Sequence, residues 1–260
     1  MKLKTDISYD FYIPNAYLSL SFISFFYFFL ECSFPPLSLD PLLSANLFAM
    51  AISIFDHELP FDTHNLYDVS FDSDRIQTLV TSSPSVVDSW IFDIYRIHRR
   101  RLNRLIVGLD LEWRPSFNRH VQNPVATLQL CVGRRCLIFQ LIHATYIPES
   151  LVDFLGQTNF TFVGVGIKSD VEKLLDDYEL EVACVVDLRL LAVEELGKMQ
   201  LRNAGLKQLA WEVLGKQIEK PRNIKMSRWD NEWLTRAQIQ YACLDAFLSF
   251  EIGRLLNAAS

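Results

Sequence analysis

Several common features are missing from this sequence, and each absence narrows the class of protein. The chain has 260 residues with 25 Lys and Arg against 31 Asp and Glu, so it carries no excess of positive charge. Its formal net charge of −6 argues against attachment to nucleic acid by bulk charge, although a local basic patch is compatible with it. The five cysteines include no CxxC pair and are odd in number. This argues against a disulfide framework or a zinc site and fits a reducing compartment.

The N-terminal residues differ from the rest of the chain. Residues 16–30 (AYLSLSFISFFYFFL) are almost continuously apolar, but this run is shorter than the roughly 20 residues of a membrane-spanning helix. A signal peptide also fits poorly, because Asp6 and Asp10 lie in its n-region and no A-x-A site directly follows the apolar run. We therefore expect residues 1–49 to be an extension outside the fold, with translation starting at Met50. A genuine anchor or signal at residues 16–30 is the alternative.

Residues 50–260 alternate strand-like and helix-like segments. Short apolar or alternating runs bounded by turn residues predict strands, and apolar residues at helical spacing predict helices. This order predicts an α/β domain of three layers, with a mixed central sheet flanked by helices and a core of about residues 65–258. The predicted strands are 66–71, 76–81, 105–109, 126–132, 136–141, 161–167 and 183–188, and the predicted helices are one from Ser85, 148–155, 169–178, 204–214 and 235–256.

Three consecutive arginines, Arg99, Arg100 and Arg101, follow the first predicted helix. Cations near a helix C-terminus interact favourably with the helix dipole, and we favour this interpretation of the run. A nucleic-acid-binding patch is the alternative.

The predicted strand 105–109 runs into two acids in the stretch GLDLEWRP. On a strand, Asp110 and Glu112 point to the same face, about 6.6–6.8 Å apart along the chain, while Leu111 packs behind them. Carboxylates this close repel when both are ionised, unless a cation lies between them. D-x-E alone is weak evidence for a metal, because solvated strand ends often carry acids.

Three further residues join this pair. Asp170 lies in the first turn of a predicted helix, after the glycine-containing strand FVGVGIKSD, although the helix dipole alone would explain an acid there. Tyr241 and Asp245 are i and i+4 on the last predicted helix, so they share one face. A half-buried tyrosine with an unrelated acid is the alternative for that pair.

Together, D-x-E on a strand, Asp at the opening of a later helix and Y-x-x-x-D on the last helix resemble the DEDDy class of 3′→5′ exonucleases, which has the DnaQ or ribonuclease H-like fold. The stretches LIVGLDLEWRP, ATLQLCVG, FVGVGIKSDVEKL, LKQLAWEVLG and QIQYACLDAF occur in the order of that family. HELPFDTHNLYDVSF and the helix from Ser85 resemble the leading section of plant-type Werner-syndrome-like exonucleases. The resemblance covers about Met50 to the C-terminus and omits residues 1–49.

The resemblance implies a catalytic role for five residues. Asp110, Glu112, Asp170 and Asp245 would hold two divalent ions, with Asp110 bridging both, and Tyr241 would orient the attacking water. An all-oxygen carboxylate set suits Mg²⁺ or Mn²⁺ rather than zinc. The implied reaction is two-metal hydrolysis of phosphodiester bonds from the 3′ end of nucleic acid, with DNA favoured over RNA.

Contacts with the substrate are expected beside these acids. Leu111 and Trp113 flank them, although Trp113 fits a plain core position equally well. A basic loop, KQIEKPRNIKMSRW, would neutralise phosphates, and a merely solvated loop is its alternative. The expected substrate-binding residues are Leu111, Trp113, Lys220, Arg222, Lys225 and Arg228.

Alternative functions remain open at this point. An exoribonuclease of the ribonuclease D kind shares the five residues, and a non-catalytic nucleic-acid-binding module would share the fold. No GxxxxGK[ST] motif is present, because Gly215 and Lys216 are followed by Gln217, so any helicase is expected to be a separate partner, as is any DNA-end-binding protein. We expect a nuclear or cytoplasmic protein without stable membrane association, unless residues 16–30 are a real anchor.

Overall fold

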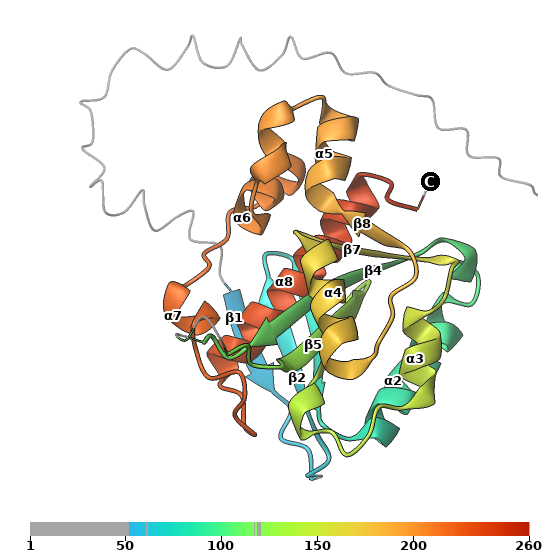
Figure 1. The fold of residues 1–260 in the computed structure, drawn as a ribbon, viewed down its shortest axis with the longest axis vertical. Helices are drawn as coiled ribbons and strands as arrows, with labels where there is room; N and C mark the ends of the chain where they lie inside the picture. The colour runs from blue at the N-terminus through green and yellow to red at the C-terminus, as the bar shows by residue number, and fades with distance from the viewer. Residues whose placement is uncertain (1–51, 61, 117, 119–120, 260) are drawn as a thin grey trace, which may run out of the picture. The chain divides into compact units, whose positions relative to one another are not determined.

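The computed structural model describes residues 52–60, 62–116, 118 and 121–259 (Figure 1). The extension expected at residues 1–49, with its apolar run 16–30, lies outside these ranges. Within them, no helix is both long and apolar enough to cross a membrane.

A mixed sheet forms the centre of the described domain. Its eight strands follow the order β1-β2-β3-β6-β5-β4-β7-β8. The pairs β3–β6, β4–β7 and β7–β8 are parallel, and the other neighbours are antiparallel. The strands are β1 (Ile52–Asp56), β2 (His64–Phe71), β3 (Asp74–Thr81), β4 (Leu105–Trp113), β5 (Val125–Val132), β6 (Arg135–Phe139), β7 (Phe160–Gly164) and β8 (Val185–Asp187).

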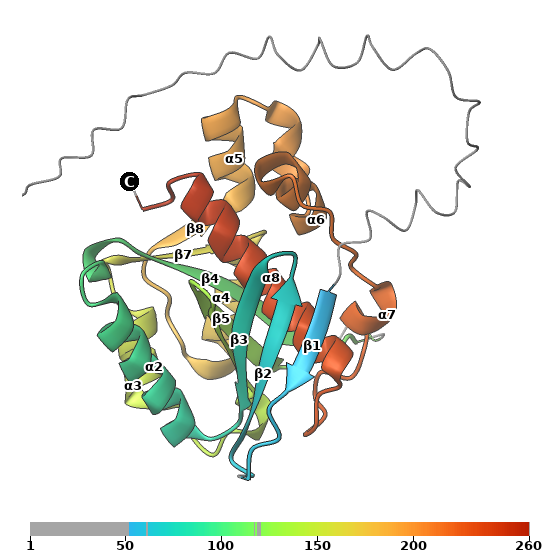
Figure 2. The ribbon, with the colours of Figure 1, turned by 180° about the vertical axis from the view of Figure 1, so that it is seen from behind.

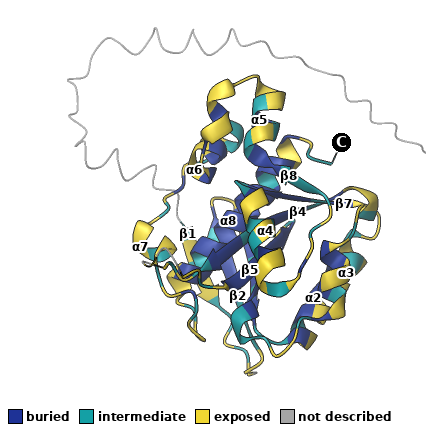
Figure 3. Ribbon diagram, in the orientation of Figure 1, coloured by how far each residue is buried: buried dark blue, intermediate teal, exposed yellow. Residues whose placement is uncertain are grey.

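Helices cover both faces of this sheet, as the three-layer prediction requires (Figures 1 and 2). α2, α3 and α4 pack on one face through one buried apolar cluster, and α8 crosses the other face through a second. Figure 3 shows the sheet and α8 as the most buried layers. The helices are α2 (Pro84–His98), α3 (Glu149–Leu155), α4 (Ile167–Tyr178), α5 (Leu188–Leu196), α6 (Leu206–Leu209), α7 (Arg222–Lys225) and α8 (Arg236–Leu255), with short turns η1 (Leu102–Arg104), η2 (Leu141–His143), η3 (Met199–Asn203) and η4 (Ala210–Leu214).

The sheet begins earlier than the first predicted strand at 66–71. β1 pairs antiparallel with β2 and forms one edge of the sheet. Its residues alternate between partly buried and exposed, and Phe55 is 63% exposed. Ile52 and Ile54 pack against the core, but a run of five residues is too short to separate strand from other structure by pattern alone.

Several predicted boundaries were wrong around β7 and β8. β7 ends at Gly164 rather than at residue 167, because Gly166 turns the chain with φ +76° and Ile167 already begins α4. The predicted strand 183–188 shrinks to β8, and Asp187 caps a helix, α5, that was not predicted. In both places, apolar residues of the adjoining turn or helix also point into the core. They made the predicted strand longer than the observed one.

The C-terminal part combines a broken helix, a loop and the longest helix. The predicted helix 204–214 is divided into α6 and the wider turn η4, and the loop that follows contains α7. The capping box of α8 is confirmed, because the Thr235 side chain accepts a bond from the Gln238 backbone and the Gln238 side chain accepts one from Thr235.

Candidate active site

β4 positions the first two acids through its alternation. Its odd-numbered residues, such as Leu109, belong to the apolar cluster below α2–α4, whereas Asp110 and Glu112 face α8. Gly108 precedes them on that face, and a Cβ there would lie 2.0 Å from the carbonyl oxygen of Ala246 on α8. This glycine therefore allows α8 to cross β4 at very close range.

The close crossing brings three acids together. Carboxylate oxygens of Asp110, Glu112 and Asp245 all lie within 4.8 Å of one another. Glu112 and Asp245 are buried, with exposures of 8% and 4%, and Asp110 is half-buried. The i, i+2 pair on β4 thus meets a residue of the last helix, as the family resemblance implied.

Burial and mutual repulsion raise the pKa of each member of this cluster. The pKa of Asp110 lies well above its ordinary value because of burial and the charges of Asp245 and Glu112. Burial, followed by Asp245, raises the pKa of Glu112 to about 8. Burial also raises the pKa of Asp245, against the opposing effect of Lys220. The metal-free cluster is therefore short of positive charge.

The donor set around the acids fits a hard divalent cation. Every donor in the cluster is a carboxylate oxygen, the ligand type that Mg²⁺ and Mn²⁺ prefer. Gln129 on β5 lies opposite Asp110 in the sheet, and its buried amide oxygen Oε1 has no hydrogen-bond partner within the described ranges. Such an acceptor needs a water or another donor beside the acids. Sequence reasoning missed Gln129, whose polar side chain in the apolar strand ATLQLCV was the available signal.

Asp170 lies at the same pocket but outside the group of three. It stands in the first turn of α4, where burial, followed by the charge of Asp187, raises its pKa to about 6. Asp187 forms an ion pair of 2.6 Å with Arg189, whose guanidinium lies beside Gly166 at the start of α4. This pair connects α5 to the turn that presents Asp170.

Lys220 lies inside the acidic cluster. Its Nζ is 2.5 Å from Oδ2 of Asp245 and 4.9 Å from the ring centroid of Tyr241. Asp245 and Asp110 keep its pKa above the ordinary value, despite the opposing effect of burial. The basic loop thus places an ammonium group in contact with one carboxylate of the cluster, Asp245.

Tyr241 is buried beside the loop that precedes α8. It is 7% exposed, and its ring contacts the buried ring of Trp229 at a centroid distance of 6.0 Å. The side-chain amide of Gln238 donates to Ser227 Oγ and to the Arg228 carbonyl, which ties this loop to the start of α8. Burial and the charge of Asp245 raise the pKa of Tyr241, so its hydroxyl stays protonated at neutral pH.

The expected substrate-binding residues divide into two groups. Leu111, Trp113, Lys220 and Lys225 line the pocket of about 560 Å³ that contains all five predicted catalytic residues. Arg222 is exposed on α7 and Arg228 pairs with Asp230 at 3.4 Å, and neither lines this pocket. The pocket also has lining residues that were not predicted, among them Lys207, Met226 and Ser249.

An eight-stranded mixed sheet between two helical layers, with acids from β4, α4 and α8 around one pocket, defines a nuclease domain of the ribonuclease H-like fold. The chain belongs to the 3′→5′ exonuclease family, whose family model matches residues 93–258. The resemblance found in the sequence is thereby confirmed.

Individual relatives agree with this assignment. A 3′-5′ exonuclease of Arabidopsis thaliana is 36% identical over 153 residues, which is 58% of this chain and 52% of that protein. The mouse bifunctional 3′-5′ exonuclease/ATP-dependent helicase WRN is 35% identical over 153 residues, which cover 58% of this chain and 11% of that protein. The chain thus spans about half the length of the first relative and much less of the second. The structure of Brucella melitensis NrnC, with a TM-score of 0.50 and 20% identity over 59% of this chain and 72% of that one, agrees in fold.

Proposed function

We propose that this protein hydrolyses nucleic acid from its 3′ end in a reaction that needs a divalent metal, with DNA as the preferred substrate. The observation that carries the proposal is the convergence of Asp110, Glu112 and Asp245 within 4.8 Å, with Asp170 at the same pocket. Four acids that repel one another at one pocket destabilise the folded protein, and a bound cation would relieve this repulsion. The family membership supports the same reaction class.

The four carboxylates would hold the metal. Asp110, Glu112 and Asp245 would supply the clustered oxygens, with Asp110 as the bridging ligand that the family resemblance implies, and Asp170 would complete the set from α4. When bound, two Mg²⁺ or Mn²⁺ ions about 3.5–4 Å apart would stabilise the attacking and leaving oxygens of an in-line cleavage.

Tyr241 would orient the attacking water by a hydrogen bond. Its raised pKa rules out a tyrosinate base at neutral pH, and its packing against Trp229 keeps the ring in one place. A protonated hydroxyl in a fixed position can both donate and accept a hydrogen bond. The role that fits Tyr241 is therefore positioning rather than proton removal.

The pocket walls would hold the terminal nucleotide. Leu111 and Trp113 offer apolar contact beside the acids, and Lys225 offers a cation for the phosphate. Lys220 would reach a phosphate only after it leaves Asp245. Arg222 and Arg228 would contact more distant phosphates from the loop around α7.

The cellular setting is also part of the proposal. One relative carries exonuclease and helicase activities in its name, and we infer that this domain acts beside a separate helicase or DNA-end-binding protein. A nuclear or cytoplasmic location suits such a role. Residues 50–260 would be the active unit.

End-labelled oligonucleotides test the proposal. Single-stranded, blunt and recessed-3′ DNA and matched RNA are incubated with the protein in Mg²⁺, in Mn²⁺ and in excess EDTA. We expect shortening from the 3′ end with either metal, no shortening in EDTA, and faster attack on DNA than on RNA. Asp245→Asn should abolish the reaction, whereas Asp153→Asn, which changes an exposed acid on α3, should not. Undiminished degradation in EDTA, or attack on a blocked 3′ end, would contradict the proposal, and a preference for RNA would favour the exoribonuclease.

A further inference from the structure

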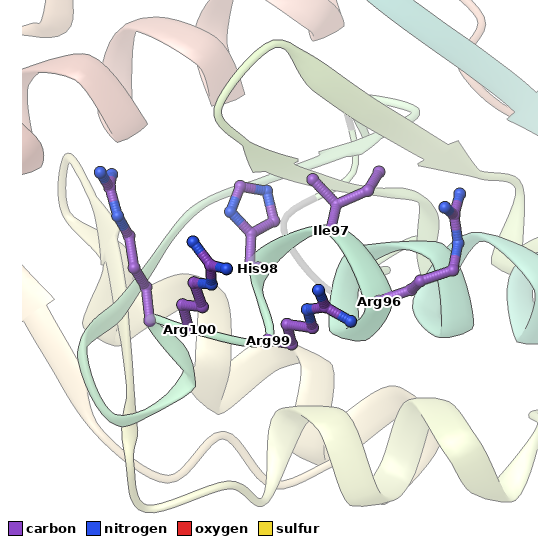
Figure 4. A pocket seen from close by; sticks show the side chains of 6 residues that line it. Arg96, Ile97, His98, Arg99 and Arg100 are labelled. Carbon is purple, nitrogen blue, oxygen red and sulfur yellow. The ribbon is translucent and has the colours of Figure 1, made fainter. Parts of the chain in front are cut away.

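A second basic region lies at the end of α2. Seven arginines line two adjoining hollows of about 690 and 500 Å³, which share Ile97 and His98; Figure 4 shows the larger-volume one of these two. We call these arginines the arginine surface: Arg75, Arg96, Arg99, Arg100, Arg101, Arg134 and Arg135.

Only part of this surface is neutralised. Arg96 and Arg135 share Asp93, at 2.8 and 3.9 Å, Arg134 pairs with Asp74, and Arg75 pairs with Asp68. Arg99, Arg100 and Arg101 are exposed and form no salt bridge within the part of the chain that the structure describes. Three carboxylates thus face seven guanidinium groups, in a chain whose net charge is −6.

The helix dipole accounts for only part of the arginine surface. α2 ends at His98, and the basic residues of its last turn are Arg96 and His98. The backbone N–H of Arg101 donates to the His98 carbonyl, so Arg99–Arg101 still lie at this helix end, whereas Arg134 and Arg135 come from the β5–β6 turn and β6. The interpretation favoured from the sequence therefore explains only the first part of the cluster.

An arginine that follows α2 and an arginine of β6 both act on His98. His98 is half-buried, and after burial itself the charges of Arg101 and Arg135 lower its pKa. Arg101 follows α2, whereas Arg135 begins β6 after the β5–β6 turn. The Cε1 atom of His98 lies near Gly133 of that turn, which places the two arginine groups side by side. Their positive potentials therefore add at one surface.

β4 connects this surface to the active-site pocket. The chain passes from Arg101 through η1 into Leu105, and Asp110 lies five residues further along β4. At about 3.3 Å per residue, this part of the strand spans about 17 Å. Figure 1 shows β4 running from the turn after α2 towards α7, so the two regions lie at opposite ends of the strand. A duplex with about 3.4 Å per base pair needs at least about five base pairs to reach both.

We propose that the arginine surface binds the phosphate backbone of the nucleic acid whose 3′ end occupies the active-site pocket. This rests on the proposed function. Guanidinium groups match phosphate oxygens in a two-pronged geometry, and a phosphate backbone is the ligand that presents charge at regular, close spacing. The surface would hold long substrates without contacting the reacting atoms.

Metal-free binding measurements isolate the surface from catalysis. Arg100→Gln/Arg101→Gln removes two unpaired charges outside α2, and Lys198→Gln/Arg202→Gln removes two exposed charges elsewhere as a control. Fluorescence anisotropy in EDTA follows a labelled duplex of about 20 base pairs with a recessed 3′ end, at 50 to 200 mM salt. We expect the arginine variant to lose affinity about tenfold at the lowest salt and the magnitude of its salt slope to fall by up to about 2, since each phosphate contact contributes about 0.9. The control should match the wild-type protein.

Hydrolysis measurements in Mn²⁺ complete the test. A trinucleotide is too short to reach the surface, so its hydrolysis should be unchanged in the arginine variant, while the long duplex is degraded more slowly at low concentration. Unchanged affinity and salt slope, or equal slowing with both substrates, would overturn the proposal. Selective loss of poly-glutamate binding would also overturn it, in favour of an acidic protein partner. The wild-type protein could instead bind the duplex through these arginines and yet cleave no substrate. That result would contradict the proposed function and still support the arginine surface as a phosphate-binding site.

Discussion

Replacing Lys220 by methionine should separate two effects of a cation on the acidic cluster: stabilisation of the metal-free protein by the lysine, and binding of a divalent metal. In the metal-free protein, the ammonium of Lys220 lies 2.5 Å from Asp245 and above the ring of Tyr241, inside a cluster that is short of positive charge. A divalent ion would bind the same carboxylates. Lys220 therefore stabilises the metal-free state and competes with the metal for Asp245.

The size of the effect follows from the burial of the pair. Removing one partner of a buried ion pair costs about 3–5 kcal/mol, because the other charge is left uncompensated. Here the Lys220 side chain is 29% exposed, and the pKa of Glu112 is already about 8, so proton uptake would offset part of the loss. We expect Lys220→Met to lower the stability of the metal-free protein by about 1–3 kcal/mol near pH 7.

Metal binding should recover most of this loss. We expect bound Mn²⁺ to restore about 1–2 kcal/mol of the variant's lost stability, because the ion takes the place of the ammonium. By linkage, the affinity of the variant for Mn²⁺ should then be roughly 5–30 times higher than that of the wild-type protein, since 1.4 kcal/mol corresponds to a factor of ten. Titration calorimetry with Mn²⁺ and thermal unfolding with and without metal measure both quantities. Lys207→Met is the matched control, because Lys207 lines the same pocket but pairs with Glu219 at 2.9 Å. Equal or weaker Mn²⁺ affinity in the Lys220 variant would refute the competition.

Three other perturbations address the remaining groups of the site. Tyr241→Phe should lower turnover roughly 10–1,000-fold with little change in substrate affinity, whereas unchanged turnover and a lower melting temperature would indicate a packing role. Asp110→Ala should abolish nuclease activity and leave the metal-free melting temperature unchanged or higher, because it relieves repulsion; an unfolded variant would show that Asp110 is structural. The raised pKa values of Glu112 and Asp170, about 8 and about 6, contribute stability at low pH that is lost as pH rises through them. The melting temperature in EDTA should therefore fall from about pH 4.5 to 8, and the gain on adding Mn²⁺ should grow over the same window; a rising melting temperature in EDTA would contradict these shifts.

Local patterns in the sequence were sufficient to predict much of the fold. The strand-to-helix order predicted the three-layer α/β class, and the capping box at Thr235 correctly marked the start of α8. The two-residue period of β4 predicted that Asp110 and Glu112 share a face, as they do in the structure. These features depend on residues that are near neighbours in the chain, so backbone geometry alone relates them.

Where tertiary contacts compete with local pattern, the prediction failed. β1 is a five-residue edge strand that pairs with β2 and packs Ile52 and Ile54 against the core, and it was not predicted from the sequence. The apolar pattern of a strand continues past the end of β7. The left-handed backbone of Gly166 nevertheless turns the chain there and begins α4. The arginines after α2 were interpreted through their own helix, since nothing in the sequence places them beside Arg134 and Arg135.

The amino-acid sequence established which groups are available and how each is presented locally: two acids on one strand face, one acid at a helix start, and a tyrosine and an acid on one helix face. Distances between these groups came from the tertiary structure. Gly108 lets α8 approach β4 closely enough to bring Asp245 within 4.8 Å of Asp110 and Glu112. The loop before α8 places the ammonium of Lys220 against Asp245. Side-chain periodicity acts over a few residues, whereas charge and close packing act through space, so only the folded chain decides which charges meet.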